Sequence, residues 1–360
     1  MIKYINTVLV LCAFLYSQSS PVRIATYNIL NFPGSTGDER VPSFQLVLDE
    51  ISPDILVVQE MLSQDGADTF LNDVLNYSNL TFAASNFING YDTDNMLYYN
   101  PSKVDYINQT EIATALRDIN GYTLSVEQDT FTIYSVHLKA SQGSTNEQKR
   151  LEEVQDLHSQ LNWDYPSIVA GDFNIYTANE SAYNYLLDDI LLIDPLDAYG
   201  NWHNNSQYAY LHSQSTRTTD FGGGSTGGMD DRFDMILISD GLTDNFIDGS
   251  YTSYGNDGQH LNMAINDGNN GNVSQEIANA LHLASDHLPV YADFLFTYSV
   301  TQGDVNADGS VDIFDIQLII NFMLGLAEAT SDQFETGDLN NDGFLDIFDI
   351  IQITFIILGR

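Results

Sequence analysis

Cysteine is nearly absent from this sequence, which has one, Cys12, among 360 residues. A single thiol cannot close an intramolecular disulfide, so a fold held together by disulfide bonds is excluded. Cys12 lies within residues 1–20, which predict a secretory signal peptide, because Lys3 precedes an apolar run, 8–16, and small polar residues follow it. The run is too short to span a bilayer, so a transmembrane anchor is the weaker alternative. We therefore expect a secreted protein that is stabilised by its core and by bound metal.

Basic side chains are also scarce, since Lys and Arg number 11 against 50 Asp and Glu, and the formal net charge is −39. A broad basic surface of the kind that grips duplex DNA through its phosphates is therefore excluded. A chain this acidic is expected to be soluble and to attract divalent cations. Because basic residues are so few, any Lys or Arg that lies beside a polar motif is a candidate functional residue.

Residues 301–360 contain an internal repeat, in which GDVNADGSVDIFDI at 303–316 recurs as GDLNNDGFLDIFDI at 337–350, with a period of 34. Oxygen-bearing side chains occupy positions 1, 3, 5, 9 and 12 of each loop, and glycine at position 6 allows a sharp turn. EF-hand loops bind Ca²⁺ in this way, because this hard cation takes about six to eight oxygen ligands. The predicted ligands, with position 7 contributing its backbone carbonyl, are Asp304, Asn306, Asp308, Ser310, Asp312, Asp315, Asp338, Asn340, Asp342, Phe344, Asp346 and Asp349.

An apolar helix is expected after each of these loops, and position 12 is Asp where EF-hands usually have Glu. In these features residues 301–360 resemble the dockerin module, whose paired loop–helix units bind Ca²⁺ and dock onto a cohesin domain. The resemblance implies a C-terminal dockerin-like domain with a cohesin-type scaffold as its partner. Positions 10 and 11 help to contact the partner in dockerins, and here they are Ile313–Phe314 and Ile347–Phe348. Their identity in the two copies predicts docking in two orientations.

Residues 21–298 alternate between helix-like and strand-like patterns. Apolar residues recur at helical spacing in 43–51 and 146–161, which predict two amphipathic helices. Strands and helices in this loose alternation favour an α/β sandwich with mixed sheets. Short apolar or alternating runs predict strands at 22–28, 54–60, 131–138, 166–172, 233–239 and 289–296.

Two long polar loops, 200–230 and 254–275, interrupt this pattern. Loops of this length are usually functional or disordered. They contain His203, His212 and His260, which we expect to be solvated, with contact to a substrate as the alternative.

Polar side chains stand where the predicted strands begin or end. In a mixed sheet the ends of some strands lie beside the starts of others, so such side chains can line one cleft at one edge of the sandwich. The two that follow the strand 166–172 are two positions apart, which aims both at the same place. The residues of this set are Asn28, Glu60, His137, Asp172, Asn174, Asp234, Asp286 and His287.

Short motifs surround these residues, in the order NIL (28–30), QE (59–60), SVHL (135–138), GDFN (171–174), DRFD (231–234) and SDHLPV (285–290). With these motifs residues 21–298 resemble the endonuclease/exonuclease/phosphatase superfamily, the DNase I-like family. The resemblance implies a four-layered α/β sandwich of two mixed β-sheets flanked by helices. It also implies hydrolysis of phosphodiesters or phosphomonoesters with a divalent metal, Mg²⁺ or Mn²⁺. Glu60 would be the principal metal ligand, assisted by Asn28 and by Asp286, directly or through water.

Five further side chains receive catalytic roles from the same resemblance. Asp172 would orient and deprotonate the attacking water, and Asn174 would help to position the water or the phosphate. His287, held by Asp234, would stabilise charge on the phosphoryl oxygens, because a carboxylate raises the basicity of an imidazole and fixes its tautomer. His137 would do similar work from the other side of the phosphate.

Three bases lie beside the motifs and are the predicted contacts to substrate phosphate, with pairing to the surplus acids as the alternative for each: Lys139, Arg217 and Arg232. Asp234 could pair with Arg232 rather than with His287. In some relatives the first histidine is held by a carboxylate from an earlier strand, and Asp92 or Asp94 could fill that role for His137.

Three functions are compatible with these patterns. The first is a secreted metal-dependent nuclease or phosphodiesterase, in which the long loops shape a groove and HSQSTRT (212–218) supplies hydroxyls and an arginine for phosphate. The second is a lipid phosphodiesterase of the sphingomyelinase type, which would want an exposed aromatic hairpin that no compact stretch supplies. The third is a non-catalytic surface protein attached through the dockerin-like domain. We favour the first, with nucleic acid as the substrate.

Overall fold

The computed structural model describes residues 21–78, 81–296 and 301–359. These residues form two compact units, one from Pro21 to Phe296 and one in the C-terminal segment. The predicted signal peptide, residues 1–20, lies outside the described residues. Among the helices of the described segments, none has both the length and the apolar composition that crossing a membrane requires.

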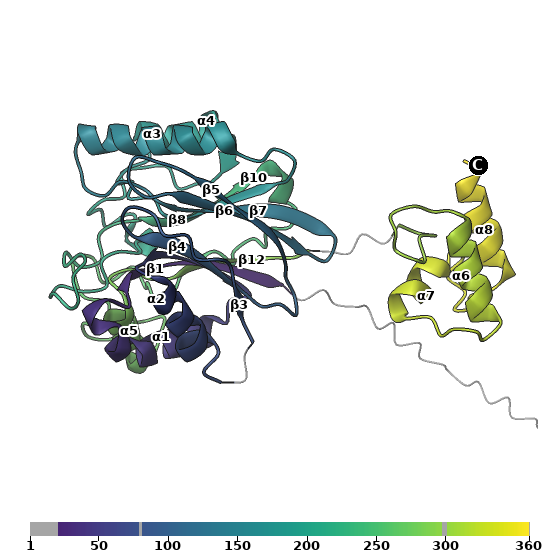
Figure 1. Ribbon diagram of the computed structural model, residues 1–360. Coiled ribbons are helices and arrows are strands. Elements are labelled where there is room, and N and C mark those ends of the chain that lie inside the picture. The colour runs from purple at the N-terminus through teal and green to yellow at the C-terminus, as the bar shows by residue number, and fades with distance from the viewer. Residues whose placement is uncertain (1–20, 79–80, 297–300, 360) are drawn as a thin grey trace, which may run out of the picture. The chain divides into compact units, whose positions relative to one another are not determined.

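The first unit contains two six-stranded sheets that stack face to face (Figure 1). The first sheet has the strand order β11 (Thr252–Ser253), β12 (Val290–Phe294), β1 (Val22–Phe32), β2 (Ile55–Met61), β4 (Asp94–Tyr99) and β3 (Ala83–Ala84). The second sheet has the order β5 (Asp105–Ile112), β6 (Ile119–Val126), β7 (Asp129–His137), β8 (Ser167–Asp172), β10 (Asp234–Ser239) and β9 (Leu192–Ile193).

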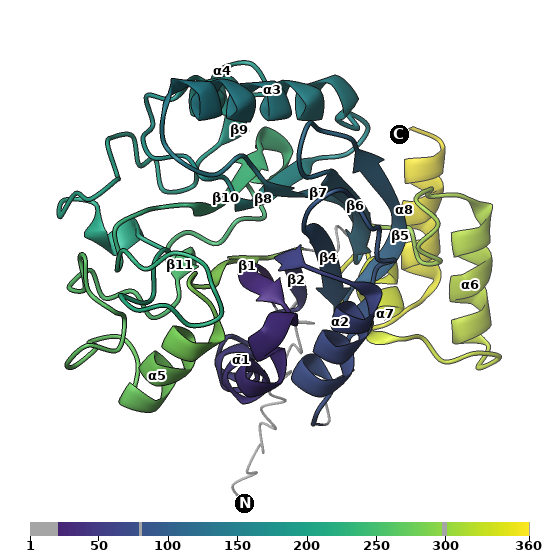
Figure 2. The ribbon, with the colours of Figure 1, turned by 60° about the vertical axis from the view of Figure 1, so that its left-hand side comes forward.

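Helices cover the outer face of each sheet, so that the unit has four layers, as the sequence predicted (Figure 1). The first sheet is covered by α1 (Gly37–Ile51), α2 (Gln64–Thr69) with the π-helical turn η2 (Phe70–Leu75), and α5 (Gln275–Ala284). The second sheet is covered by α3 (Ser144–Gln160) and α4 (Ser181–Asp188). Figure 2 shows α1 and α5 side by side under the first sheet. Short 3₁₀ turns are η1 (Gly34–Thr36), η3 (Ala209–Leu211) and η4 (Asp240–Leu242).

Strand direction brings the polar strand ends to one edge of each sheet. β1 and β2 run parallel, with Asn28 opposite Gln59. β7 and β8 also run parallel, and His137 lies opposite Asp172. Because β10 is antiparallel to β8, its first residue, Asp234, lies opposite Asp172 as well. The ends of β7 and β8 and the start of β10 therefore meet.

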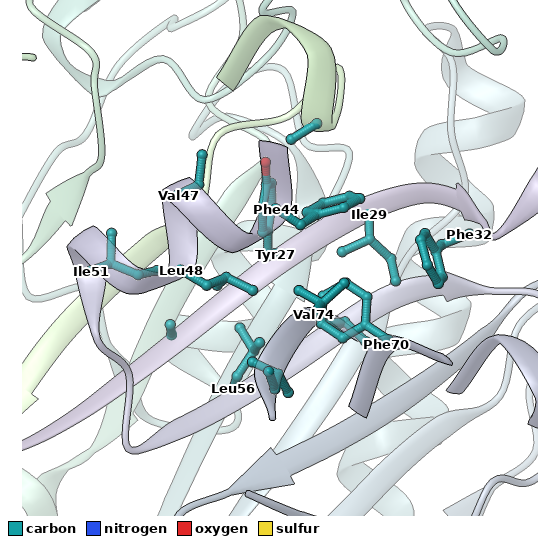
Figure 3. Packing of buried hydrophobic residues seen from close by; sticks show 14 of the residues in the cluster. Tyr27, Ile29, Phe32, Phe44, Val47, Leu48, Ile51, Leu56, Phe70 and Val74 are labelled. Atoms are coloured by element: carbon teal, nitrogen blue, oxygen red, sulfur yellow. The ribbon is translucent and has the colours of Figure 1, made fainter. Parts of the chain in front are cut away.

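The core confirms the amphipathic pattern of the first predicted helix. Figure 3 shows Phe44, Val47 and Ile51 of α1 packed over the first sheet, where Tyr27 and Ile29 point toward them. These side chains are all at most 1% exposed. Burying one large apolar side chain stabilises a fold by about 1.5–3 kcal/mol, so this layer fixes α1 firmly on the sheet.

The hairpin of β5 and β6 was not predicted as two strands. β5 is an edge strand in which most side chains are exposed, and Ile112 is its one buried residue. A strand with little burial does not carry the apolar alternation by which strands are identified in a sequence. Pairing with β6 makes this segment a strand.

The C-terminal unit contains α6 (Ile313–Met323), α7 (Ser331–Gly337) and α8 (Ile347–Ile357). The sequence predicted the helices after each loop and missed the short α7. The buried apolar centre of the C-terminal unit is small and consists of Val305, Ile319 and Ile353.

Candidate active site

One amide joins the two sheets at the edge where the polar strand ends meet. The Nδ2 group of Asn28, on β1, donates a hydrogen bond of 3.0 Å to Oε1 of Glu60 and one of 3.1 Å to Oδ2 of Asp172. Its Oδ1 atom accepts from the backbone N–H of Leu30 at 3.0 Å. Asn28 and Asp172 are almost completely buried. The amide therefore fixes two carboxylates from opposite sheets next to each other.

Glu60 adopts a left-handed backbone conformation, with φ of 68°, where β2 shifts register against β4. Such a conformation is uncommon for a residue with a side chain, and strained residues of this kind cluster at functional sites. Its Oε2 atom accepts a hydrogen bond of 2.9 Å from the backbone N–H of Asn31. Burial, and then the neighbouring charge of Asp286, raise the pKa of the Glu60 carboxyl. A cation beside the carboxylate would offset both effects.

Asp286 precedes β12 and has one carboxylate oxygen that the protein does not satisfy. Its Oδ2 atom accepts a hydrogen bond of 2.6 Å from the backbone N–H of Ser225, whereas Oδ1 is buried and has no hydrogen-bond partner among the described residues. An unpaired buried carboxylate oxygen is costly. Together with Glu60 it offers the carboxylate oxygens that a hard dication such as Mg²⁺ prefers, so these two residues fit a divalent cation, while Oδ1 of Asn28 already accepts from Leu30.

His287 is flanked on both ring nitrogens. Its Nδ1 atom lies 2.7 Å from Oδ2 of Asp234, and its Nε2 atom lies 2.9 Å from the amide nitrogen of Gln214. Oδ2 of Asp234 also accepts from the Ser213 hydroxyl at 2.7 Å. Burial by itself lowers the pKa of His287, but the charges of Asp234 and Asp172 outweigh it, and the pKa lies well above its ordinary value. These carboxylates therefore favour the protonated form of the imidazole, and Asp234 fixes its orientation through Nδ1.

Asp172 lies between two histidines. Its Oδ2 atom is 3.5 Å from Nε2 of His137 and 3.7 Å from Nε2 of His287. Burial, which outweighs the opposing charge of His287, raises the pKa of the Asp172 carboxyl to about 7. For His137, burial and then the charge of Arg117 lower the pKa well below its ordinary value. The site thus places a carboxyl whose pKa is raised to about 7 between two imidazoles, one with a lowered and one with a raised pKa.

Asn174 helps to hold the carboxylate of Asp172 in position. Its backbone N–H donates to Oδ1 of Asp172 at 3.0 Å, and its side-chain Nδ2 donates to the carbonyl of Leu138 at 3.2 Å. Its φ of 52° places it in the left-handed region, which asparagine tolerates better than most residues. The spacing of Asp172 and Asn174 brings the two residues together through this turn.

Two of the predicted phosphate contacts are wrong. The guanidinium of Arg232 is buried and binds Asp194 through two hydrogen bonds, of 2.8 and 2.9 Å. Arg217 is buried as well, and its Nη2 group donates to the carbonyl of His282 at 2.8 Å and its Nη1 group to that of Phe221. Both arginines are therefore part of the protein interior, and Arg232 does not compete for Asp234.

The third predicted base, Lys139, is half-buried, and its Nζ atom donates to the carbonyl of Ala140 at 3.0 Å. It remains a predicted phosphate contact. Neither proposed partner of His137 reaches it, because Asp92 lies 3.1 Å from Nε of Arg117 and Asp94 accepts from the backbone of Gly90. The Nδ1 atom of His137 has no hydrogen-bond partner among the described residues.

Sequence reasoning missed Arg117 and Gln214. Arg117 is half-buried between β5 and β6, close enough to His137 for its charge to depress the pKa of that imidazole. The scarcity of bases was the available signal, but Arg117 adjoins none of the motifs. Gln214 belongs to HSQSTRT, from which we expected hydroxyl and arginine contacts, and it is the amide that reaches His287.

The expectation that the loop histidines are solvated is wrong for two of them. His212 is fully buried, and its Nε2 atom donates to the carbonyl of Trp202 at 2.8 Å. His260 is buried between Oδ1 of Asp257, at 2.8 Å, and the carbonyl of Asp267, at 3.0 Å. Both histidines stabilise the long loops through hydrogen bonds within them. The polar composition of those loops therefore reflects internal hydrogen bonding.

The C-terminal loops curl around their acidic residues. In the first loop, Asp304 accepts from the backbone N–H groups of Asp308 at 3.1 Å and Gly309 at 2.9 Å. Asp315 is fully buried and accepts from the backbone of Asp312 at 2.8 Å, which forms a capping box at the start of α6. The second loop repeats this arrangement before α8. Carboxylates gathered in this way are typical of a Ca²⁺ loop.

The first unit is thus a four-layered sandwich with carboxylates, amides and imidazoles gathered where its two sheets meet. The chain belongs to the Endonuclease/Exonuclease/phosphatase family, which matches residues 25–287. Residues 302–357 match the Dockerin type I domain. Both findings confirm the two resemblances seen in the sequence. The comparison with curated proteins gives no match.

Solved structures share the fold of the first unit. The human Nocturnin catalytic domain with bound sulfate anion has a TM-score of 0.51 and 21% identity, covering 77% of this chain and 95% of that chain. D. rerio TDP2 complexed with single strand DNA product has a TM-score of 0.51 and 14% identity, covering 76% and 99%. A family protein from Leptotrichia buccalis C-1013-b has a TM-score of 0.50 and 15% identity, covering 76% and 100%. At these identities the likeness shows the fold.

Proposed function

We propose that the chain is a secreted, divalent-metal-dependent phosphodiesterase that hydrolyses nucleic acid. The observation that carries the proposal is the hydrogen-bonded convergence of Asn28, Glu60 and Asp172 from two sheets, with His137 and His287 on either side of Asp172. The structural neighbour TDP2, which is complexed with a single strand DNA product, supports nucleic acid as the substrate.

Glu60, Asn28 and Asp286 would hold the cation, which supplies Lewis-acid stabilisation of the negative charge that develops on the phosphoryl group. The charges and the burial of these residues create a site that favours a cation. Burial and the charge of Asp286 raise the pKa of Glu60, and Oδ1 of Asp286 lacks a hydrogen-bond partner within the described segments. Positive charge is therefore favoured here whether or not substrate is present.

Asp172 is the general base of the proposed reaction. Hydrolysis adds water across one P–O bond, and the proton of the attacking water passes to Oδ2 of Asp172. A base is most effective when its pKa lies near the working pH, and the pKa of Asp172 is raised to about 7. Asn28 and Asn174 hold the carboxylate in place through bonds of 3.1 and 3.0 Å to its two oxygens.

The two imidazoles stabilise the phosphoryl oxygens in different ways. His287, whose pKa the charges of Asp234 and Asp172 raise, would act in its protonated form once Nε2 faces a phosphoryl oxygen in place of the Gln214 amide nitrogen, and Asp234 fixes its ring through Nδ1 at 2.7 Å. Burial depresses the pKa of His137, so it would offer a hydrogen bond without a charge. Donors positioned in advance toward developing negative charge are among the largest contributions to catalysis.

The dockerin domain points to action outside the cell. Dockerins bind Ca²⁺ and dock onto cohesin domains, so we propose that the enzyme works attached to a scaffold or to the cell surface. Ile313–Phe314 and Ile347–Phe348 are exposed at the starts of α6 and α8 and would contact such a partner. Their equivalence supports docking in two orientations.

A parallel assay tests the proposal. The full chain with Mg²⁺ and Ca²⁺ is incubated with plasmid DNA, RNA, sphingomyelin vesicles and a simple bis-ester, beside the variant Glu60→Ala. We expect metal-dependent degradation of DNA or RNA by the wild type only. Cleavage of sphingomyelin alone would replace the proposal with a lipid phosphodiesterase, and hydrolysis of none of the substrates would contradict enzymatic function.

A further inference from the structure

A second cluster of metal-ligating side chains lies outside the site described above. His203, Asp230 and Asp231 each offer one ligand atom within 4.8 Å of the others. The Nδ1 atom of His203 lies 2.7 Å from Oδ1 of Asp231. We propose that these three side chains bind a transition-metal dication such as Mn²⁺ or Zn²⁺, at a site separate from that of Glu60.

The charges of the cluster do not balance without a cation. Asp231 is 5% exposed, and Asp230 beside it is half-buried. Burial and then the charge of Asp230 raise the pKa of Asp231 to about 7, and burial raises the pKa of Asp230 too. Within the described residues, His203 is the one basic side chain in ion-pair contact with the cluster, at Asp231. Two carboxylates brought together in this way need a proton or a metal ion to neutralise them.

The imidazole of His203 is held in place on both sides. Its Nδ1 faces the carboxylates, and its Nε2 lies 3.0 Å from the side-chain amide nitrogen of Gln142. Nδ1 is therefore the ring atom that would bind the ion. The ring of Tyr176 packs edge-on against it at a centroid distance of 5.3 Å.

Backbone hydrogen bonds hold Asp230 and Asp231 in place. The N–H of Asp230 donates to the carbonyl of Gln214 at 2.8 Å, and the carbonyl of Asp231 accepts from the N–H of Gln214 at 3.1 Å. The N–H of Asn204, next to His203, donates to the carbonyl of Asp230 at 2.8 Å. The ligands from two distant segments are thus positioned before any ion binds, which lowers the entropy cost of binding.

The ligand set selects a different class of metal from the site at Glu60. Imidazole nitrogen suits Zn²⁺ and similar transition metals and carboxylate suits Mn²⁺ among others, whereas Mg²⁺ and Ca²⁺ take oxygen ligands. Three protein ligands leave further positions to water. The side chain of His203 is 34% exposed, which gives an ion access from solvent. The inference does not rest on the proposed hydrolase activity, because metal binding is measured directly.

Counting bound Mn²⁺ tests the inference. The full chain is stripped of metal, its dockerin loops are saturated with Ca²⁺, and Mn²⁺ is titrated while the free ion is followed by electron paramagnetic resonance. We expect His203→Gln and Asp230→Asn each to bind one Mn²⁺ fewer per chain than the wild type, with an unchanged circular dichroism spectrum. His158→Gln is the matched control, since it makes the same exchange at a half-buried histidine of α3 whose Nδ1 lies 2.9 Å from the Tyr185 hydroxyl, and it should bind as many ions as the wild type.

The number of bound Mn²⁺ ions also shows whether an ion is lost from the Glu60 site or from the His203 cluster. Glu60→Gln should remove a different Mn²⁺ ion, so the double variant Glu60→Gln/Asp230→Asn should bind two fewer than the wild type. Equal counts for the wild type, His203→Gln and Asp230→Asn would overturn the inference and leave the cluster as a hydrogen-bonded anchor of the loop. Asp231 is left unchanged because its burial makes any replacement a risk to the fold.

Discussion

The Nδ1 atom of His287 lies 2.7 Å from Oδ2 of Asp234, a residue 53 positions earlier in the chain. The pairing depends on the antiparallel arrangement of β10 and β8, which places the start of β10 beside the end of β8. It gives His287 a raised pKa in a buried position, where burial alone would lower it. The pairing thereby favours a protonated imidazole next to the carboxylate of Asp172.

Removing the side chain of His287 or of Glu60 should stop turnover without unfolding the protein. We expect His287→Ala and Glu60→Ala to lower the rate of phosphodiester hydrolysis by about 10²- to 10⁴-fold. Glu60 is a strained and desolvated carboxylate, so its loss should not lower the melting temperature. The rates are measured with plasmid DNA and folding by circular dichroism. Wild-type rates in either variant would show that the active centre lies elsewhere.

Arg117 should contribute to substrate binding. Arg117→Gln removes a half-buried cation beside His137, and we expect KM for a nucleic acid substrate to rise about 10- to 100-fold, as for a lost charge-assisted hydrogen bond. The value of kcat should change less. Lys149→Gln is the control, because it makes the same change in net charge at an exposed position of α3. Equal effects of the two variants would mean that only the overall charge matters.

Arg232 should matter for stability and not for the substrate. Arg232→Met leaves the carboxylate of Asp194 buried without its partner, which typically costs about 3–5 kcal/mol of unfolding free energy. The double variant Arg232→Met/Asp194→Leu should recover much of this loss. Urea denaturation measures both. A large rise in KM with unchanged stability would restore Arg232 as a phosphate contact.

Glu153 should make stability depend on pH. It is buried, and its carboxylate accepts from the backbone N–H of Lys139 at 2.8 Å. Burial raises its pKa from 4.5 to about 7 in the folded state. The folded state therefore binds this proton more tightly than the unfolded state, so the contribution is complete below pH 4.5 and is lost as the pH rises through about 7.

Glu153→Gln mimics the protonated carboxyl and removes this dependence. We expect the stability of the variant relative to the wild type to increase between about pH 4.5 and 7 and to level off above. Thermal unfolding across this range measures the difference. A difference that stays constant with pH would show that Glu153 is ionised in the folded protein throughout.

Removing Ca²⁺ should loosen the C-terminal unit alone. Its apolar centre is small, and its loops concentrate carboxylates such as Asp304 and Asp308 that repel one another without a cation. Limited proteolysis of the full chain in chelator should cleave within residues 301–359 while 21–296 stay intact. Equal resistance with and without Ca²⁺ would mean that the unit folds independently of metal.

Much of the site could be predicted because its residues mark strand ends. Asp172 directly follows an apolar run, and the strand pairing that gathers such ends follows from the mixed sheets. Arg232 could not be placed, because its partner Asp194 lies in a stretch that carries no motif. His212 and Gln214 were likewise misjudged, since polar loops that fold on themselves look like solvated loops in a sequence.

Anomalous diffraction from crystals of the full chain soaked in Mn²⁺ tests the central claim most directly. The account predicts a strong peak beside the carboxylate of Glu60, within ligand distance of Asn28 or Asp286, and its loss in Glu60→Ala. A peak elsewhere in residues 21–296 with none beside Glu60 would contradict the proposed catalytic centre.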